Sequence, residues 1–82
     1  MSESRSEVLR AFGQLIRQRR QALGISQEEL GYRAGLDRTY VSGLERGVRN
    51  PSLTALVNLA RGFGISVSDL TMHLEKEMKN ED

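Results

Sequence analysis

The stretch SQEELGYRAGLDRTYVSGLERG, residues 26–47, predicts two short helices joined by a tight turn. Ser26 and Glu29 have the spacing of a capping box, in which each side chain bonds the other residue's backbone amide, so a helix is expected to begin directly after the serine. Apolar residues at helical spacing follow as far as Ala34. Gly35 comes next, and glycine is the residue that most easily adopts the left-handed conformation that ends a helix. The first helix of the stretch is therefore expected to end near Ala34.

The second helix of the stretch has one apolar and one polar face. Asp37 is of the residue type that caps the start of a helix. Val41 and Leu44 are three residues apart, so they lie on one side of the helix that follows. Four polar residues project elsewhere: Arg38, Thr39, Ser42 and Arg46. We expect the apolar face to pack in the core and the polar face to remain free to contact another molecule.

Length and composition limit what that other molecule can be. A chain of 82 residues has the size of one domain, so residues 1–82 are expected to form a single domain with no second domain for a small-molecule effector. Cysteine is absent, which excludes disulfides and thiolate metal sites. No apolar run approaches the ~20 residues that span a bilayer, and residues 1–20 lack the apolar core of a signal peptide. We expect a cytoplasmic protein with no metal, cofactor or membrane partner.

The charge is unevenly distributed, although the net charge is only +1. Residues 5–61 carry ten arginines against five acids, a net +5, whereas residues 62–82 carry two lysines against five acids, a net −3. A basic body with an acidic end favours a protein whose body faces phosphate groups. A mixed, solvated surface is the alternative interpretation of the same charges.

The rest of the chain predicts three further helices and no strand. An apolar stripe at helical spacing covers residues 6–23, and a loop with the only proline covers residues 47–52. Ser52 is expected to cap the next helix, which the glycines of residues 62–64 end. A last helix is expected from about Ser66, with its charged C-terminal end frayed. These predictions give an all-α fold of five helices.

Six motifs extend the pattern beyond the central stretch: IRQRR at 16–20, SQEEL at 26–30, the turn Gly35, ERG at 45–47, Pro51 and LARGFGISVSDL at 59–70. Over residues 12–71 the sequence resembles the Xre, or Cro/C1-type, helix-turn-helix family, which has the phage-repressor fold. Within that family the run LDRTYVSGLERGVRN is similar to the controller proteins of restriction-modification systems. The resemblance implies a compact five-helix domain, with its helix-turn-helix at 26–47, that regulates transcription by binding double-stranded DNA.

Residues at the start of the second helix are the candidates for reading bases, because a major groove accepts one helix and the first turn of that helix meets the base edges. Arg38 can donate two hydrogen bonds to a guanine, or alternatively contact a phosphate. Thr39 can contact a base or hydrogen-bond within the start of its own helix. Glycine inside a helix costs ~1 kcal/mol relative to alanine, so Gly43 predicts either a close approach to DNA or drift at a tolerant position. The predicted base-reading set is Arg38, Thr39, Ser42 and Gly43.

Other polar residues are predicted to hold the DNA backbone or the fold. Gln27 lies at the amino end of a helix, where donors gather, and the resemblance implies that it contacts a phosphate. The further backbone candidates are Tyr40, Arg46, Arg49, Asn50, Arg33 and Arg17. Solvated surface is the default interpretation of Arg17 and Arg33, and packing as an ordinary aromatic side chain is the alternative for Tyr40. For Arg20 and Glu45 the resemblance implies a structural, partly buried salt bridge. Gly31 is expected to keep a tight contact with the second helix.

The last helix is the predicted dimerisation element. Its interface residues are Leu70, Leu74, Met78 and Met72. The core is expected to need Leu70 as well, whereas the other three lie beyond the common core of the family, where few partners within the chain are expected. A homodimer would bury them and set two reading helices ~34–36 Å apart on a palindromic operator, whereas a solvated helix end is the alternative. Without an effector domain, occupancy would follow protein concentration, which suits a regulator of its own operon.

An enzymatic function is not expected. The single histidine, His73, lies among charged residues, and no nucleophile–base pair, metal-ligand cluster or phosphate-binding loop can be assembled from the motifs. The alternative function is an antitoxin or other protein-interaction module that binds DNA secondarily. RNA polymerase is a further candidate partner, through Glu45 or another acid near the end of the reading helix, but the salt-bridge role of Glu45 is preferred.

Overall fold

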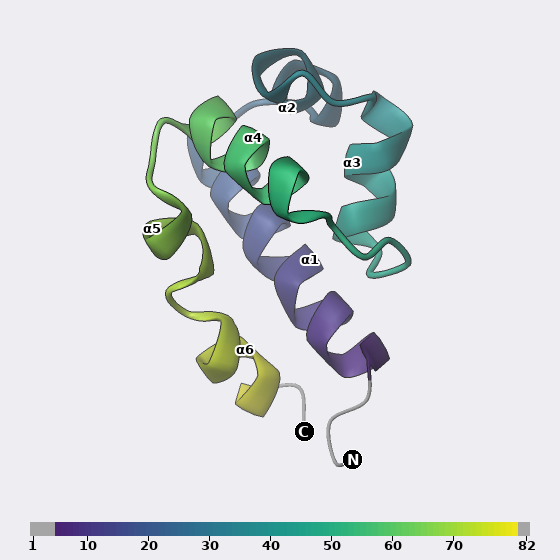
Figure 1. The fold of residues 1–82 in the computed structure, drawn as a ribbon, viewed down its shortest axis with the longest axis vertical. Coiled ribbons are helices and arrows are strands. Elements are labelled where there is room, and N and C mark those ends of the chain that lie inside the picture. The colour runs from purple at the N-terminus through teal and green to yellow at the C-terminus, as the bar shows by residue number, and fades with distance from the viewer. Residues whose placement is uncertain (1–4, 81–82) are drawn as a thin grey trace.

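Six helices follow one another along residues 5–80, the part of the chain that the computed structural model describes. They are α1 (Arg5–Leu23), α2 (Gln27–Ala34), α3 (Arg38–Glu45), α4 (Leu53–Phe63), α5 (Val67–Thr71) and α6 (Leu74–Asn80), as Figure 1 shows. The all-α prediction is confirmed. The predicted fraying at Glu81 and Asp82 lies outside the described residues. Within the described range, no helix is both long enough and apolar enough to cross a membrane.

Serine hydroxyls fix the beginnings of α2, α4 and α5. Ser26, Ser52 and Ser66 each accept a hydrogen bond from the backbone amide three residues later, at 2.9, 3.0 and 3.0 Å. Gly35 ends α2 in the left-handed conformation, with φ 68°. At the start of α3 the prediction needs correcting, because Asp37 occupies the capping position but its side chain makes no capping hydrogen bond. Three of the four predicted caps therefore act through their side chains.

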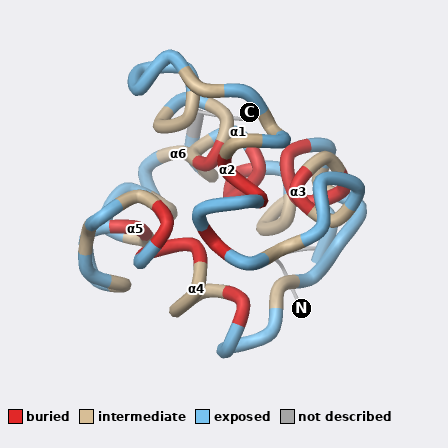
Figure 2. The backbone as a smooth tube through the Cα atoms, turned by 90° about the horizontal axis from the view of Figure 1, so that it is seen from above, coloured by how far each residue is buried: buried red, intermediate tan, exposed pale blue. Residues whose placement is uncertain are grey.

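The core lies where α1, α3 and α4 meet α2. Figure 2 shows the buried stretches of these helices turned toward the middle of the bundle and the exposed stretches around the outside. Helix α2 packs on α3 and α4, while α1 packs on α3. Five large side chains are fully buried: Ile16, Leu30, Val41, Leu44 and Leu59. The apolar faces expected from the sequence therefore form one continuous core.

Two glycines allow backbones to touch. A Cβ atom added to Gly13 would collide with the carbonyl oxygen of Leu44 and lie 2.6 Å from that of Glu45, so α1 and α3 meet without a side chain between them. A Cβ atom added to Gly31 would lie 2.5 Å from the carbonyl oxygen of Leu36. The tight contact expected of Gly31 is present, and its partner is the turn before α3.

The predicted last helix is divided in two by a turn at residues 72–73. Thr71 donates its hydroxyl hydrogen bond to the carbonyl oxygen of Val67 at 3.1 Å, and such side chains compete with the regular backbone pattern. After the turn, α6 lies beside α1 and packs on it (Figure 1). Leu74 thereby joins the edge of the core. The expectation of few partners within the chain beyond the common core is therefore wrong for α6.

Candidate nucleic-acid interface

Helix α3 has the two faces that the sequence predicts. Val41 and Leu44 are fully buried, which anchors the inner face in the core. Arg38 and Thr39, in the first turn, are exposed, and Arg46 is exposed just after the last turn. Figure 1 shows α3 at the edge of the molecule, with α1, α2 and the amino end of α4 on its inner side. The outer face of α3 is therefore open to a large partner.

A buried carboxylate lies at the end of α3. The side chain of Glu45 is 0% exposed, and its Oε2 accepts a hydrogen bond from Arg20 Nε at 2.6 Å. Its Oε1 accepts from Arg20 Nη2 at 3.0 Å, from Gln27 Nε2 at 3.0 Å and from Arg17 Nε at 3.4 Å. Arg20 also donates from Nη1 to the carbonyl oxygen of Ile25 at 2.9 Å. The structure thus forms the expected Arg20–Glu45 pair and ties α1, α2 and α3 together through it.

Both members of this pair are held in their charged forms. Burial alone would raise the pKa of Glu45, but the hydrogen bonds from Arg20, Gln27 and Arg17 outweigh burial and leave that pKa lower than usual. The hydrogen bond to Glu45 raises the pKa of Arg20. A bidentate arginine–carboxylate contact of this kind also fixes the orientation of the two side chains relative to each other.

The same carboxylate positions two predicted DNA-backbone residues. Gln27, the first residue of α2, gives one of its two amide hydrogens to Glu45 and keeps a second. The side chain of Arg17 is 44% exposed and donates its Nε to Glu45. Both side chains therefore lie beside the amino end of α2, where backbone amides and the helix dipole favour an anion. Sequence reasoning placed both residues among the phosphate contacts but missed their common anchor.

A second cluster lies along the outer side of α3. The guanidinium carbon of Arg49 is 5.6 Å from the centre of the Tyr40 ring, at cation–π distance. Gly43, in the same helix, is buried, and the Arg49 side chain lies beside it. Gly43, predicted to approach DNA directly, thus meets a side chain of its own chain first. Asn50 is exposed in the same loop.

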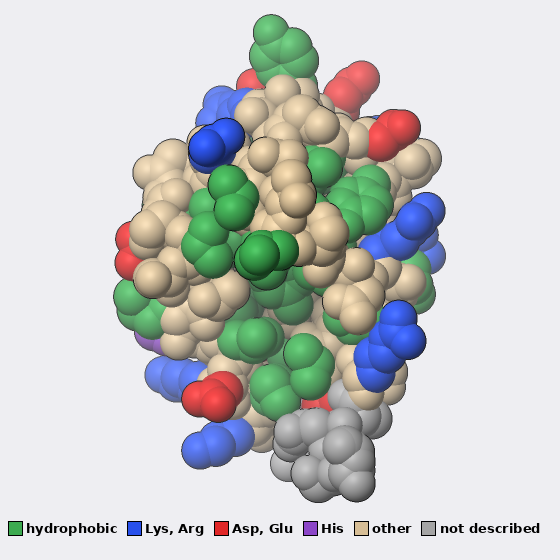
Figure 3. Space-filling view, viewed as in Figure 1, with side chains coloured by type: hydrophobic (Ala, Val, Ile, Leu, Met, Phe, Trp, Pro, Cys, Tyr) green, Lys and Arg blue, Asp and Glu red, His purple; other side chains and the backbone are tan. Residues whose placement is uncertain are grey.

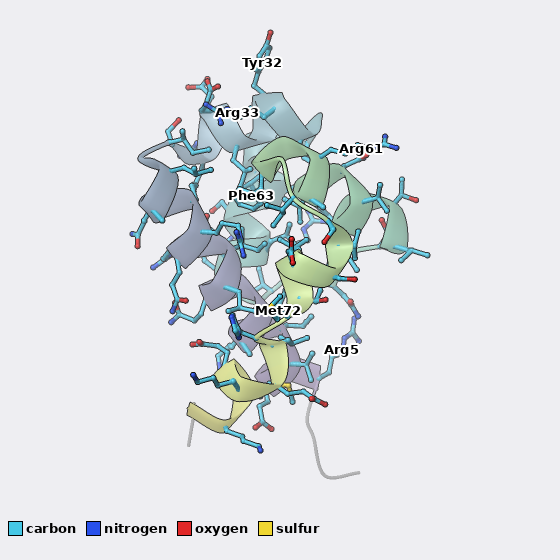
Figure 4. The ribbon with its side chains drawn as sticks, turned by 90° about the vertical axis from the view of Figure 1, so that its left-hand side faces the viewer. Arg5, Tyr32, Arg33, Arg61, Phe63 and Met72 are labelled. Atoms are coloured by element: carbon cyan, nitrogen blue, oxygen red, sulfur yellow. The ribbon has the colours of Figure 1, made fainter. Side chains whose placement is uncertain are left out.

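The remaining predicted DNA contacts have polar partners within the chain. Arg33 donates to Glu29 at 2.9 Å across one turn of α2, so this glutamate pairs with the arginine. Figure 4 shows Arg33 near the tip of α2, beside Tyr32, which points away from the molecule. Arg46 donates to the hydroxyl of Ser42 at 3.4 Å. Ser42 is half-buried, and this hydrogen bond orients its hydroxyl group.

The predicted dimerisation residues are only partly available for a partner. Leu70 is buried and Leu74 packs against the core, so these two side chains serve the fold of the single chain. Met78 is half-buried, whereas Met72 in the turn between α5 and α6 is 60% exposed. Leu53, at the start of α4, is 75% exposed, whereas the apolar spacing of this helix predicts that it is buried.

An apolar hollow lies between α1, α4 and the α5–α6 segment. Its volume is about 160 Å³, and Figure 3 shows hydrophobic side chains gathered over this part of the surface. The lining includes Val8, Leu9, Pro51, Leu56 and Leu74. Across residues 5–80, no group of three or more acidic or histidine side chains is arranged to hold a metal ion.

These features match a family of known fold. The sequence profile of the Helix-turn-helix family matches residues 16–70, from the middle of α1 through α5. The chain belongs to the helix-turn-helix family. Its relatives include Control protein C.MunI from Mycoplasma sp, which is 42% identical over 59 residues, covering 72% of this chain and 80% of that protein.

Solved structures give the same relationship. The restriction-modification controller protein C.AhdI from Aeromonas hydrophila is similar with a TM-score of 0.73 and 48% identity, covering 76% of this chain and 94% of that one. The controller protein C.Esp1396I, solved as a tetramer in complex with its natural 35 base-pair operator, has a TM-score of 0.79 and 35% identity. That similarity covers 88% of this chain and 95% of the relative, so the phage-repressor-like fold is shared over nearly the whole domain.

Proposed function

We propose that this protein is the controller protein of a restriction-modification system. It binds double-stranded DNA in a sequence-specific manner, as a homodimer on a palindromic operator, and regulates transcription of its own operon. It acts in the cytoplasm by binding rather than by catalysis, with operator DNA, a second copy and RNA polymerase as its partners. The observation that carries the proposal is α3, whose outer face is open while its inner face is anchored in the core.

Helix α3 supplies the base contacts in this proposal. Arg38 lies in the first turn, which reaches the floor of the major groove, and its planar fork matches guanine O6 and N7. That contact is worth ~1–3 kcal/mol of discrimination against another base. Thr39 and Ser42 extend the base contacts along α3.

The backbone contacts flank α3 on both sides. On one side are Gln27 and Arg17, fixed by Glu45 beside the amino end of α2. On the other side are Arg49 and Asn50, in the loop after α3, together with Tyr40 of α3 itself and Arg46 directly after it. Contacts on both flanks would set the depth and tilt of α3 in the groove without reading sequence themselves. Arg33 lies farther along α2 and is paired with Glu29, so its contribution is the general positive charge.

A second copy would cover the exposed apolar surface. Met72 and Leu53 are exposed, and the surface also carries the hollow lined with apolar side chains. Symmetric dimers are the commonest oligomers. We expect Met72→Glu to shift the sedimentation coefficient of a dimer toward that of a monomer. Tyr32→Glu, at the exposed tip of α2, is the matched control and should leave the dimer intact. Equal behaviour of the two variants would place the dimer interface elsewhere.

The C-terminal segment favours this regulator over an antitoxin. An antitoxin that neutralises its partner through its tail would carry an extension free of the body, whereas α6 is folded onto α1 as far as residue 80. The proposed function therefore does not require a toxin as a partner.

Selection of bound duplexes from a random-sequence pool tests the proposal. At about 150 mM salt, nonspecific phosphate attraction is reduced, so enrichment reports sequence reading. The proposal predicts an inverted repeat whose half-sites lie about one helical turn of DNA apart, or a multiple of it. A pool that remains random after repeated rounds would contradict it and favour the protein-interaction module.

A further inference from the structure

We propose that Gly43 is a positioning residue for DNA binding. The side chain of Arg49 packs against this glycine, which holds it along α3 in position to bind a phosphate beside the reading helix. This inference rests on the proposed function and deepens it. It assigns the glycine a role through another side chain, in place of the direct approach to DNA that the sequence predicts.

The first step is what covers Gly43. A Cβ atom added to this glycine would lie 2.5 Å from Arg49 Cγ, 3.6 Å from Arg49 Cβ and 3.5 Å from Arg49 Nε. The stem of the arginine therefore occupies the space that any other side chain at position 43 would take. Gly43 is buried although α3 lies at the edge of the molecule, and the exposed Arg49 side chain is the neighbour that lies against it.

The second step is where the guanidinium goes. Its carbon lies 5.6 Å from the centre of the Tyr40 ring, and Tyr40 precedes Gly43 by three residues, about one helical turn. The arginine therefore runs from the loop along α3 toward the amino end of the helix, where Arg38 and Thr39 are exposed. Its stem packs on the glycine backbone, its charge faces the aromatic ring, and its N–H groups remain at the surface.

The third step is why this placement matters for binding. A free arginine samples many rotamers and loses that freedom when it contacts DNA, whereas an arginine already held in place loses less. A planar fork fixed beside the reading helix matches a phosphate with two parallel hydrogen bonds. Any side chain at position 43 would push the stem away and leave the charge mobile.

A matched arginine elsewhere in the protein gives the control. The guanidinium carbon of Arg19 lies 6.0 Å from the centre of the Phe63 ring, a similar stack in a different place. Phe63 is at the carboxyl end of α4, on the side of the molecule away from α3 (Figures 1 and 4). Arg19→Ala removes the same charge and the same kind of stack without touching the proposed phosphate contact.

The test is a double-mutant cycle on an operator duplex obtained by selection, with dissociation constants measured by fluorescence anisotropy at several salt concentrations. We expect Arg49→Ala to weaken binding about tenfold, as for a charged hydrogen bond, and to lower the slope of log affinity against log salt by about one. Gly43→Ala alone should weaken binding by a similar factor. The double variant should bind no more weakly than Arg49→Ala, and Arg19→Ala should stay within about twofold of the wild type.

Two results would overturn the inference. If Gly43→Ala weakens binding by the same factor with and without Arg49, the glycine meets DNA directly. If Arg49→Ala changes the affinity and its salt dependence no more than Arg19→Ala does, Arg49 binds no phosphate. Thermal melting separates these results from misfolding, because alanine at 43 should raise the melting temperature once Arg49 is shortened. A wild-type protein that prefers no duplex would instead overturn the proposed function itself.

Discussion

Glu45→Gln tests whether the buried Arg20–Glu45 pair stabilises the fold. It keeps the shape of the side chain but removes the charge that faces Arg20, and it brings an amide donor where the carboxylate accepted hydrogen bonds. The carboxylate is 0% exposed and the Arg20 side chain 15% exposed, so water screens this pair little. The hydrogen bond from Arg17 is longer, and the Arg17 side chain is 44% exposed, so this bond contributes little to the free energy of unfolding.

Breaking a buried ion pair by removing one partner costs about 3–5 kcal/mol, and the lower end applies because Arg20 retains some contact with water. A domain of this size has a total stability of about 4–12 kcal/mol, at ~0.05–0.15 kcal/mol per residue. The variant should therefore lose a large part of its free energy of unfolding. Its melting temperature should fall by at least about 12 °C.

Urea unfolding followed by circular dichroism measures this loss. The matched control is Glu29→Gln, which breaks the pair with Arg33 at 2.9 Å on the surface of α2, where both side chains are almost half exposed. That pair is worth about 0.3–0.5 kcal/mol. If the two variants lose the same free energy of unfolding, the reasoning from the buried carboxylate is refuted.

Acid provides an independent check on the same group. The pKa of Glu45 is lowered in the folded protein, so the unfolded chain takes up the proton first. The stability that the carboxylate contributes is present above the unfolded pKa of about 4.3 and is lost as the pH falls through the folded pKa. The free energy of unfolding of the wild type should thus fall more steeply below about pH 4 than that of Glu45→Gln. If the free energies of unfolding of the wild type and of Glu45→Gln vary with pH in parallel, the pKa of Glu45 is not lowered by folding.

Two further substitutions test the packing of the helices. Gly13→Ala places a methyl group against the backbone of α3 and should destabilise the protein by about 1–3 kcal/mol in urea unfolding, despite the better helix propensity of alanine. Its control is Gln14→Ala on the exposed face of α1, and a stabilised Gly13→Ala would disprove the backbone contact. Ser52→Ala removes the acceptor for the Ala55 amide at 3.0 Å and should cost about 1 kcal/mol. An unchanged melting temperature, matching that of the exposed Ser68→Ala, would contradict that capping role.

The sequence predicts most of the fold because its helix signals are local. Ser26, Ser52 and Ser66 stand directly before helices, and Gly35 directly after one, so each boundary depends on a few neighbouring residues. The turn at residues 72–73 escaped prediction because the apolar spacing continues through it to Leu74. The turn brings α6 against α1, a contact between segments far apart in the sequence.

The site could be predicted less completely, because its geometry depends on side chains from different elements. The polar face of α3 follows from helical periodicity alone, and exposure of Arg38 and Thr39 agrees with it. No local pattern indicates that Gln27 bonds Glu45, 18 positions later in the chain. The contact of Arg49 with Gly43 likewise depends on how the loop after α3 folds back.

The measurement that tests the central claim most directly is the affinity of the wild type and of Arg38→Ala for a selected duplex and for a scrambled duplex of the same length, at one salt concentration. The wild type should prefer the selected duplex by about 10³-fold or more. Arg38→Ala should reduce that preference by about 5- to 150-fold and leave the affinity for the scrambled duplex nearly unchanged, whereas Gln27→Ala should weaken both duplexes alike. Equal losses on the two duplexes in Arg38→Ala would contradict base reading by α3.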